Sequence, residues 1–174
     1  MEIFQIDDHG QLFISPDIDD WTLVAAQRIT AIFDLDEAVD RGVPALANHL
    51  LYVYFPFEDK ELPDLQQLHA LAQLGAQLMT QGARVLVHCG MGHNRSALLA
   101  GVILTYVGMT GAETVVRLRQ RRAGALYNKA FAAYLQALPC THPALNDPGA
   151  WRLEAARTSL VDPHPATLVS LQSL

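Results

Sequence analysis

"VLVHCGMGHNRSALLAG", from Val85 to Gly101, joins a short apolar run to a longer apolar segment through a loop with two glycines. The first run is typical of a buried strand, and the second segment predicts a helix that begins near Arg95. Cys89 lies where the strand ends. Proteins with alternating strands and helices bind ligands at the carboxyl ends of their parallel strands, so this loop is the first candidate for a functional site.

Strand and helix patterns alternate on both sides of this stretch. The turn-rich "DDHG" predicts a hairpin over residues 3–14, and Ser15 followed by Pro16 predicts a helix start. Further strands are predicted at 29–35, 49–57 and 84–88, the last of which is expected at the centre of the sheet. Further helices are predicted at 63–79, 95–107, 110–122 and 127–138, with Thr110 as the N-cap of the 110–122 helix. The alternation predicts an α/β fold with a central, mostly parallel sheet and helices on both faces.

Length and composition favour a single domain. The chain has 174 residues, of which 51% are hydrophobic, and we expect residues 1–138 to form the domain. Residues 139–174 hold most of the late prolines and have no strong period. We expect them to form a C-terminal extension that is partly disordered, with a short helix near Trp151–Arg157.

Charge and cysteine content limit the partners. A net charge of −6 argues against stable binding of nucleic acid or of a membrane surface. The N-terminal residues lack the pattern of a signal peptide, and no apolar stretch is long enough for a membrane span. The two cysteines do not form a disulfide framework, so we expect a cytoplasmic location. The residues leave the oligomeric state open.

The loop after Cys89 has the features of an anion-binding site. Gly90 and Gly92 let successive backbone N–H groups point inward, and the following helix N-terminus adds partial positive charge. Such surroundings favour the thiolate form of a cysteine, and Arg95 supplies a fork for two phosphate oxygens. Cys89 can therefore attack phosphorus while Arg95 holds the transition state. An inert buried cysteine is the simpler alternative, but it would leave the glycines and Arg95 unexplained.

Other loop chemistries fit less well. A Walker A loop needs a Gly-Lys-Ser/Thr sequence, and a dinucleotide-binding loop needs a third glycine where Arg95 stands. A zinc site built from His88, Cys89 and His93 lacks a second cluster of ligands, because Cys140 has only His142 close by. We therefore expect no metal and no cofactor.

"HCGMGHNRS" resembles the signature of cysteine-dependent protein tyrosine phosphatases, in which His-Cys is followed by five residues, arginine and serine or threonine. The glycine in the middle of the five resembles the small dual-specificity branch, and the resemblance covers residues 13–138. It implies a tyrosine-phosphatase-like fold and hydrolysis of phosphomonoesters through a phosphocysteine intermediate. The implied phosphate-binding residues are Gly90, Met91, Gly92, His93, Asn94 and Arg95.

The resemblance also implies a general acid upstream of the cysteine. In "FPFEDKELPDL", Asp59 stands 30 residues before Cys89 and matches the family position. Its role is to protonate the leaving oxygen and then to deprotonate water. Glu58 is the rival acid, and a solvated charged loop is the plain alternative. We expect Asp64 to cap the next helix instead.

The remaining family positions are expected to support the reaction. Ser96 is expected to form a hydrogen bond with the Cys89 sulfur. His88 is expected to hold the loop in place through hydrogen bonds. Many relatives carry a glutamine that positions the hydrolytic water. The nearest alignment places Phe131 there, with Asn128 a few residues earlier, so we expect the hydrolytic step to depend either on Asp59 alone or on Asn128. Arg119 and Arg122 either face the active site or are solvated helix charges.

The substrate implied by the resemblance is a phosphorylated protein or a small phosphomonoester. Residues 90–94 contain no lysine or arginine, which favours phosphotyrosine, with phosphoserine and phosphothreonine, over phosphoinositides. The Gly-His-Asn-Arg run also resembles relatives that act on RNA 5′ phosphates. An inactive phosphate-binding module is the alternative from another functional class. Cys89, Arg95 and Asp59 are all present, which favours the enzyme.

Overall fold

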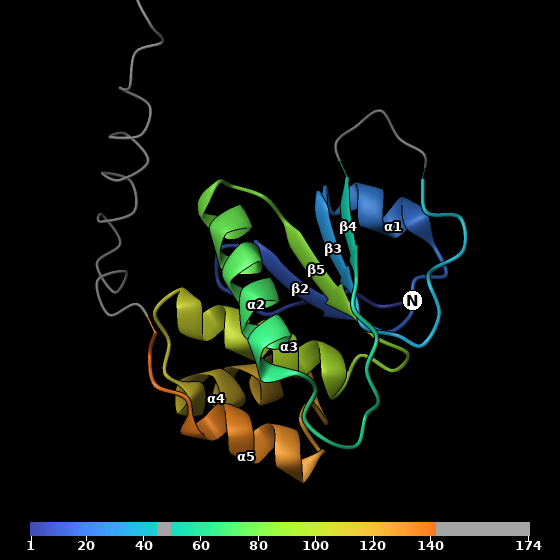
Figure 1. Ribbon diagram of the computed structural model, residues 1–174. Helices are drawn as coiled ribbons and strands as arrows, with labels where there is room; N and C mark the ends of the chain where they lie inside the picture. Colours follow the sequence, from blue (N-terminus) through green and yellow to red (C-terminus); the bar gives the residue numbers. More distant parts are fainter. Residues whose placement is uncertain (45–49, 142–174) are drawn as a thin grey trace, which may run out of the picture.

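One five-stranded sheet, in the order β1-β2-β5-β3-β4, organises the chain. The computed structural model describes residues 1–44 and 50–141 (Figure 1). β2, β5, β3 and β4 are parallel, and β1 pairs antiparallel with β2. The strands are β1 (Phe4–Gln5), β2 (Leu12–Ser15), β3 (Ala31–Asp34), β4 (Leu51–Tyr54) and β5 (Val85–His88). The predicted mostly parallel sheet with a central fifth strand is confirmed.

Helices cover both faces of the sheet, but unequally. The helices are α1 (Trp21–Ala26), α2 (Leu65–Thr80), α3 (Arg95–Tyr106), α4 (Gly111–Arg121) and α5 (Lys129–Ala137). Alternate strand residues explain the two faces: Phe13, Ile32 and Leu86 pack with α1. The neighbouring strand positions join the larger core beneath α2, α3, α4 and α5. Helices on both faces were predicted, and this is confirmed.

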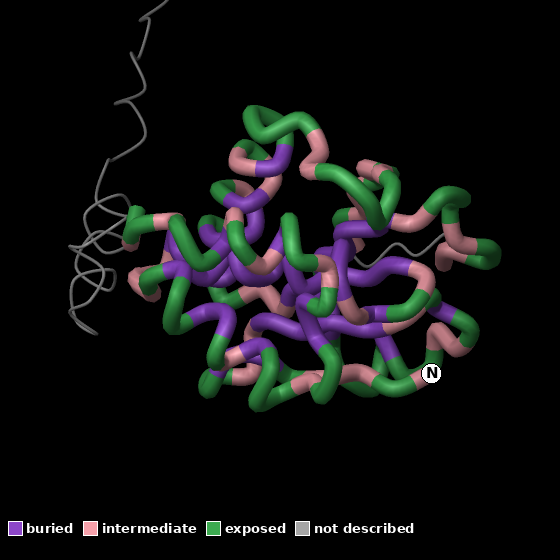
Figure 2. The backbone as a smooth tube through the Cα atoms, turned by 90° about the horizontal axis from the view of Figure 1, so that it is seen from below, coloured by how far each residue is buried: buried purple, intermediate pink, exposed green. Residues whose placement is uncertain are grey.

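α3 is the central helix of the larger layer. All twelve of its residues are buried, and in Figure 2 the buried backbone is concentrated in the middle of the molecule. A Cβ on Gly101 would lie 2.3 Å from Leu135 of α5, so the glycine permits the close approach of these two helices. Because α3 begins directly after the Cys89 loop, this packing holds the start of the helix in place.

The predicted N-terminal hairpin is present, and Asp7 stabilises its turn. The Asp7 carboxylate accepts hydrogen bonds from the backbone N–H groups of His9, Gln11 and Leu12. Gly10 follows with a φ of 70°, in the left-handed region that glycine adopts readily. The hairpin therefore carries β2 into the sheet beside β5.

The helix start predicted at Ser15 and Pro16 is wrong. Ser15 is the last residue of β2, where it pairs with His88. The first helix begins at Trp21, and Asp20 is its N-cap, accepting from the backbone N–H of Thr22. Strand pairing with β5 has overridden a local Ser-Pro signal that is typical of a helix start.

The other predicted elements differ mainly at their ends. The β3 and β4 strands are shorter than predicted because only their central residues pair. Asp64 caps α2 by accepting from the backbone N–H of Gln67, as predicted. Thr110 and Glu113 form a capping box at the start of α4, where Thr110 was predicted as the cap. The extension from residue 142, including the helix predicted near Trp151–Arg157, lies outside the described residues.

Candidate active site

The loop between β5 and α3 places Cys89 at the carboxyl edge of the sheet. Cys89 is only 2% exposed, and its Sγ lies 3.5 Å from Ser96 Oγ. Gly92 has a φ of 66°, and a Cβ there would lie 2.6 Å from the backbone of Ser15 and Pro16. Both the backbone conformation and the lack of space require a glycine. The end of β2 thus forms one wall of the Cys89 loop.

Arg95 is buried and is anchored from two other loops. Its Nη1 donates to the carbonyl oxygens of Leu35, at 2.9 Å, and Phe57, at 3.2 Å. Its Nη2 is 3.0 Å from Asp36 Oδ1 and forms an ion pair with it. The buried Nε of Arg95 has no hydrogen-bond partner among the described residues. This N–H is a free donor beside the cysteine loop, which is the chemistry that an oxyanion needs.

Asp59 is bound to the cysteine loop through side-chain amides. Asn94 Nδ2 donates to Asp59 Oδ2 at 2.8 Å, and Asn128 Nδ2 donates to Asp59 Oδ1 at 3.0 Å. Because Asn94 directly precedes Arg95, these contacts bring the predicted acid to the predicted phosphate-binding loop. The structure therefore collects Cys89, Arg95 and Asp59 at one edge of the sheet.

Glu58, the rival acid, is exposed and lies 2.7 Å from Lys60. The hydrogen bond and charge of Lys60 lower the pKa of Glu58. A general acid must hold a proton at working pH, and this ion pair favours the ionised carboxylate. Geometry and charge both favour Asp59 over Glu58.

His88 lies beneath the loop, fully buried. Its Nε2 is 2.9 Å from Asp40 Oδ2 and 3.7 Å from Asp34 Oδ1, within ion-pair range, although the ring N–H is not aligned for a hydrogen bond. The Tyr52 hydroxyl lies within hydrogen-bond distance of both carboxylates. Burial, followed by the hydrogen bond to Asp34, raises the pKa of Tyr52. His88 is thus part of a polar support under the loop.

Arg122 lies against the rim of the loop. Its Nη2 is 3.0 Å from His93 Nε2, and its guanidinium lies 4.1 Å from the centre of the Phe4 ring. Arg119 donates instead to the carbonyl oxygen of Leu126. Of the two arginines that the sequence singled out, Arg122 contacts the loop. Met91 is the exposed residue of the loop, at 65%.

Phe131 and Asn128 are the two residues that the sequence analysis considered for the position of a water-directing side chain. Phe131 is fully buried. The Asn128 amide donates to Asp59 and to the carbonyl oxygen of Lys60, and its Oδ1 accepts from the first turn of α5. The Asn128 side chain is therefore engaged in holding the Asp59 loop and in capping α5.

Comparisons with known proteins identify the family of this chain. Residues 12–138 match the family model described as "Dual specificity phosphatase, catalytic domain". The chain belongs to the dual specificity phosphatase family. No curated protein sequence matches it.

Solved structures of other proteins share the fold of this phosphatase. Human DUSP28 has a TM-score of 0.65 at 19% identity, covering 77% of this chain and 90% of that one. A mouse putative dual specificity phosphatase complexed with zinc tungstate has a TM-score of 0.67 at 20% identity, covering 83% and 90%. DUSP15 has a TM-score of 0.64 at 18% identity, covering 89% and 96%. At these identities the likeness concerns the fold alone.

Three residues of the support were missed by the sequence analysis: Asp34, Asp36 and Asp40. They follow β3 or end it, at the same edge of the sheet as Cys89, and this placement could have indicated them. A Cβ on Gly90 would lie 3.2 Å from Asp36 Oδ1, so the Asp36 carboxylate is beside the cysteine loop. Parallel neighbours β3 and β5 thus supply both the cysteine and the carboxylate that pairs with Arg95 in this phosphatase.

Within residues 1–44 and 50–141, one group could hold a metal ion. The ligand atoms of Asp34, Asp40 and His88 lie within 4.8 Å of one another. His88 already lies within ion-pair range of both carboxylates, and the Tyr52 hydroxyl lies within hydrogen-bond distance of both. In the described part of the chain, no helix is long and apolar enough to cross a membrane.

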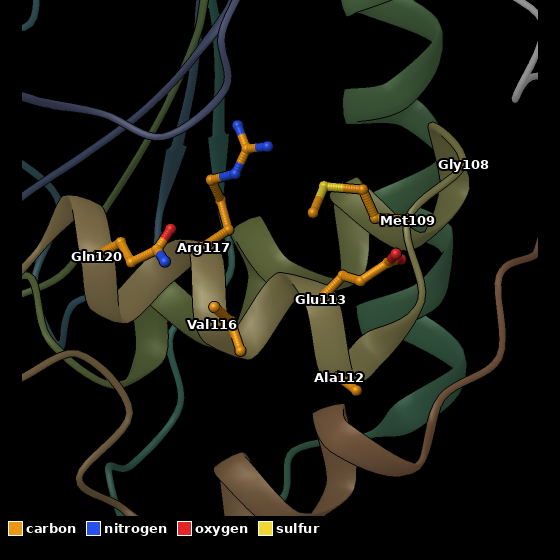
Figure 3. A pocket seen from close by; sticks show the side chains of 7 residues that line it. All are labelled: Gly108, Met109, Ala112, Glu113, Val116, Arg117 and Gln120. Carbon is orange, nitrogen blue, oxygen red and sulfur yellow. The ribbon is translucent and has the colours of Figure 1, made fainter.

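A hollow lies on α4, away from the cysteine loop. Figure 3 shows its lining: Gly108, Met109, Ala112, Glu113, Val116, Arg117 and Gln120. It begins just after the carboxyl end of α3, whereas the Cys89 loop precedes the amino end of that helix. None of its lining residues contributes to the site of this phosphatase.

Proposed function

We propose that this protein hydrolyses phosphomonoesters through a phosphocysteine intermediate, with Cys89 as nucleophile, Arg95 as phosphate ligand and Asp59 as general acid. One observation carries the proposal: the loop that holds Cys89 presents an unpaired, buried Arg95 Nε and is bound through Asn94 to Asp59. A nucleophile, an anion donor and a proton donor thus meet in one place.

In the first step, the Cys89 thiolate attacks phosphorus. A P–S bond forms, the P–O bond to the leaving group breaks, and the Asp59 proton goes to the leaving oxygen. Arg95 Nε and the backbone N–H groups of residues 90–95 bind the non-bridging oxygens. The Asp36 ion pair orients the guanidinium for this contact.

In the second step, water attacks phosphorus and the P–S bond breaks. The Asp59 carboxylate takes a proton from the water, and the departing sulfur accepts a hydrogen bond from Ser96, which lies 3.5 Å away. Phe131 is buried and Asn128 is engaged elsewhere, so Asp59 alone directs the water.

The substrate that we propose is a phosphorylated protein carrying phosphotyrosine, with phosphoserine and phosphothreonine as further substrates. Residues 90–94 carry no lysine or arginine, and the family is one of dual specificity. The negative net charge speaks against a polyanionic nucleic-acid or membrane partner. The reaction needs no metal and no cofactor, and free Cys89 and Cys140 agree with a cytoplasmic location.

The direct test replaces the nucleophile. Cys89→Ser should abolish hydrolysis of p-nitrophenyl phosphate in buffer with chelator while keeping phosphate binding. The matched control is Cys140→Ser, because Cys140 is the other free cysteine and lies outside the site. Retained turnover in Cys89→Ser would refute the mechanism.

A substrate panel separates the candidate functions. Phosphopeptides, phosphoinositides and 5′-phosphorylated RNA are compared by released phosphate, with Cys89→Ser as the blank. Preference for phosphopeptides supports the proposed substrate. Preference for RNA or lipid would replace it, and binding of phosphopeptides without turnover of any compound would identify a phosphate-binding module.

A further inference from the structure

We propose that Asn94 is a positioning residue that holds the general acid on the phosphate-binding loop. This inference rests on the proposed function, because it concerns how Asp59 is presented to the leaving group. Until this point Asn94 was expected only to line the phosphate site.

The contacts form a closed ring of three residues. Asn94 Nδ2 donates to Asp59 Oδ2 at 2.8 Å, and Asn128 Nδ2 donates to Asp59 Oδ1 at 3.0 Å. The backbone N–H of Asn128 donates to Asn94 Oδ1 at 3.0 Å, which fixes the orientation of the Asn94 amide. Asn94 is buried and Asp59 is exposed, so a fixed amide of the loop holds a carboxyl group that is otherwise open to solvent.

Asn94 makes these contacts in place of the one that its position favours. It is the N-cap residue of α3, where an asparagine side chain normally accepts from the first turn. Within the described residues it makes no such side-chain cap. Its amide contacts Asp59 and Asn128 instead. The first backbone N–H groups of α3 therefore receive no hydrogen bond from the Asn94 side chain. They are available to bind an anion.

A neutral amide suits an acid that changes protonation state twice in each cycle. An N–H donor can bond a carboxyl oxygen whether or not the group holds a proton, whereas a cation would favour the ionised form. Because Asn94 and Arg95 are consecutive, the same loop segment locates both the proton donor and the phosphate. Placing the acid is therefore tied to the conformation of the phosphate-binding loop.

The test uses the dependence on the leaving group. Phenyl phosphate, a poor leaving group, needs the acid, whereas difluoromethylumbelliferyl phosphate, a good one, needs it little. A general acid contributes on the order of 10²- to 10⁴-fold, so misplacing it in Asn94→Ala should lower kcat/KM for phenyl phosphate by about 10- to 100-fold. This parameter is compared because it reports the first step alone, before Asp59 acts on water. The loss for the good leaving group should be under about 3-fold, and inhibition by vanadate should be unchanged.

A second variant guards against loss of folding. Asn94→Asp is nearly isosteric and keeps the oxygen that accepts from Asn128, but it replaces the donor to Asp59 with a second carboxylate. It should give the same leaving-group pattern. It should also shift the alkaline limb of the kcat/KM profile to higher pH, because adjacent carboxylates share a proton. Gln120→Ala, an exposed amide on α4, is the control that should match the wild type.

The outcomes distinguish this inference from the proposed function. If Asp59→Asn shows no added loss for the poor leaving group, the acid assignment itself fails. If Asp59→Asn shows that loss but both Asn94 variants lower the two substrates equally or not at all, Asn94 does not position the acid and only this inference is overturned. A loss of vanadate binding in both Asn94 variants would likewise overturn it in favour of a role in shaping the phosphate loop.

Discussion

Arg95 and Asp59 face the same loop but are held in opposite ways. Arg95 is anchored by a carboxylate, Asp36, and by two carbonyl oxygens. Asp59 is held by neutral amides alone among its described contacts, from Asn94 and Asn128. A permanently charged group can be fixed by an opposite charge at no chemical cost, whereas a group that gains and loses a proton needs partners that accept both forms. The choice of partner thus follows the chemistry of each group.

Removing the fork of Arg95 should cause the largest loss. Arg95→Lys keeps the charge but cannot contact two carbonyls, Asp36 and a phosphate oxygen together. Loss of one transition-state donor typically costs on the order of 10²- to 10³-fold, and we expect this fall in kcat/KM for p-nitrophenyl phosphate. Arg117→Lys, on α4, is the control. Activity within 3-fold of wild type, roughly 0.7 kcal/mol, would contradict the assigned role.

Removing the carboxylate that anchors Arg95 should cost less. Asp36→Ala eliminates a charge-assisted hydrogen bond of roughly 1.5–3 kcal/mol, so kcat/KM should fall by about 10-fold or more. Asp36→Asn keeps an acceptor for Arg95 Nη2 and should retain more activity than the alanine variant. Equal losses in both variants would show that the charge of Asp36 matters rather than its position.

A second group held by neutral partners lies away from the site. His69 Nδ1 is 2.9 Å from the Tyr106 hydroxyl, and His69 Nε2 is 2.6 Å from the Tyr134 hydroxyl. Burial lowers the pKa of His69, so its neutral form is favoured by folding. The stabilisation is present above the unfolded pKa of about 6.5 and is lost as pH falls through the lower folded value.

Urea unfolding at several pH values tests this expectation. The free energy of unfolding should fall as the pH drops from about 7 to about 5, and His69→Gln should show a smaller fall over the same range. Catalysis should be little changed, since His69 lies on α2. An unchanged pH slope in His69→Gln would mean that other groups carry the dependence.

The smallest effect is expected at the capping box of α4. Thr110→Ala removes the side-chain acceptor for the Glu113 N–H and should lower the free energy of unfolding by about 1 kcal/mol. Thr110→Ser keeps the hydroxyl and should match the wild type in stability. Neither variant touches the Arg95 or Asp59 contacts, so kcat should be unaffected. A fall in kcat without a change in stability would link α4 to the site.

Much of the architecture could be predicted from the chain because local and tertiary preferences agree. The apolar run at Val85–His88 is short and continuous, as a central parallel strand requires, and the signals at Asp64 and Thr110 coincide with real caps. The failure at Ser15 has the opposite cause. Its Ser-Pro signal is local, but pairing of β2 with β5 is a contact across more than seventy residues.

The site was predictable where residues are close in sequence and much less so where the fold joins distant loops. One short stretch contains Cys89, Arg95 and Ser96, so their spacing in the sequence predicted that they lie close together. The Asp36–Arg95 ion pair joins residues 59 positions apart, and no pattern around "DLDEAVD" specified which carboxylate would reach the guanidinium. The ring through Asn94 and Asn128 similarly depends on the position of α5.

Gly92 couples the sequence of its loop to the sequence at the end of β2. A Cβ at residue 92 would lie 2.6 Å from the backbone of Ser15 and Pro16, so every other amino acid would collide there, and the φ of 66° disfavours them as well. A library of substitutions at residue 92 should therefore yield glycine alone. A variant with another residue at position 92 that regains activity should carry a second substitution around residues 15–17. The two segments, far apart in sequence, would then tolerate change only in combination.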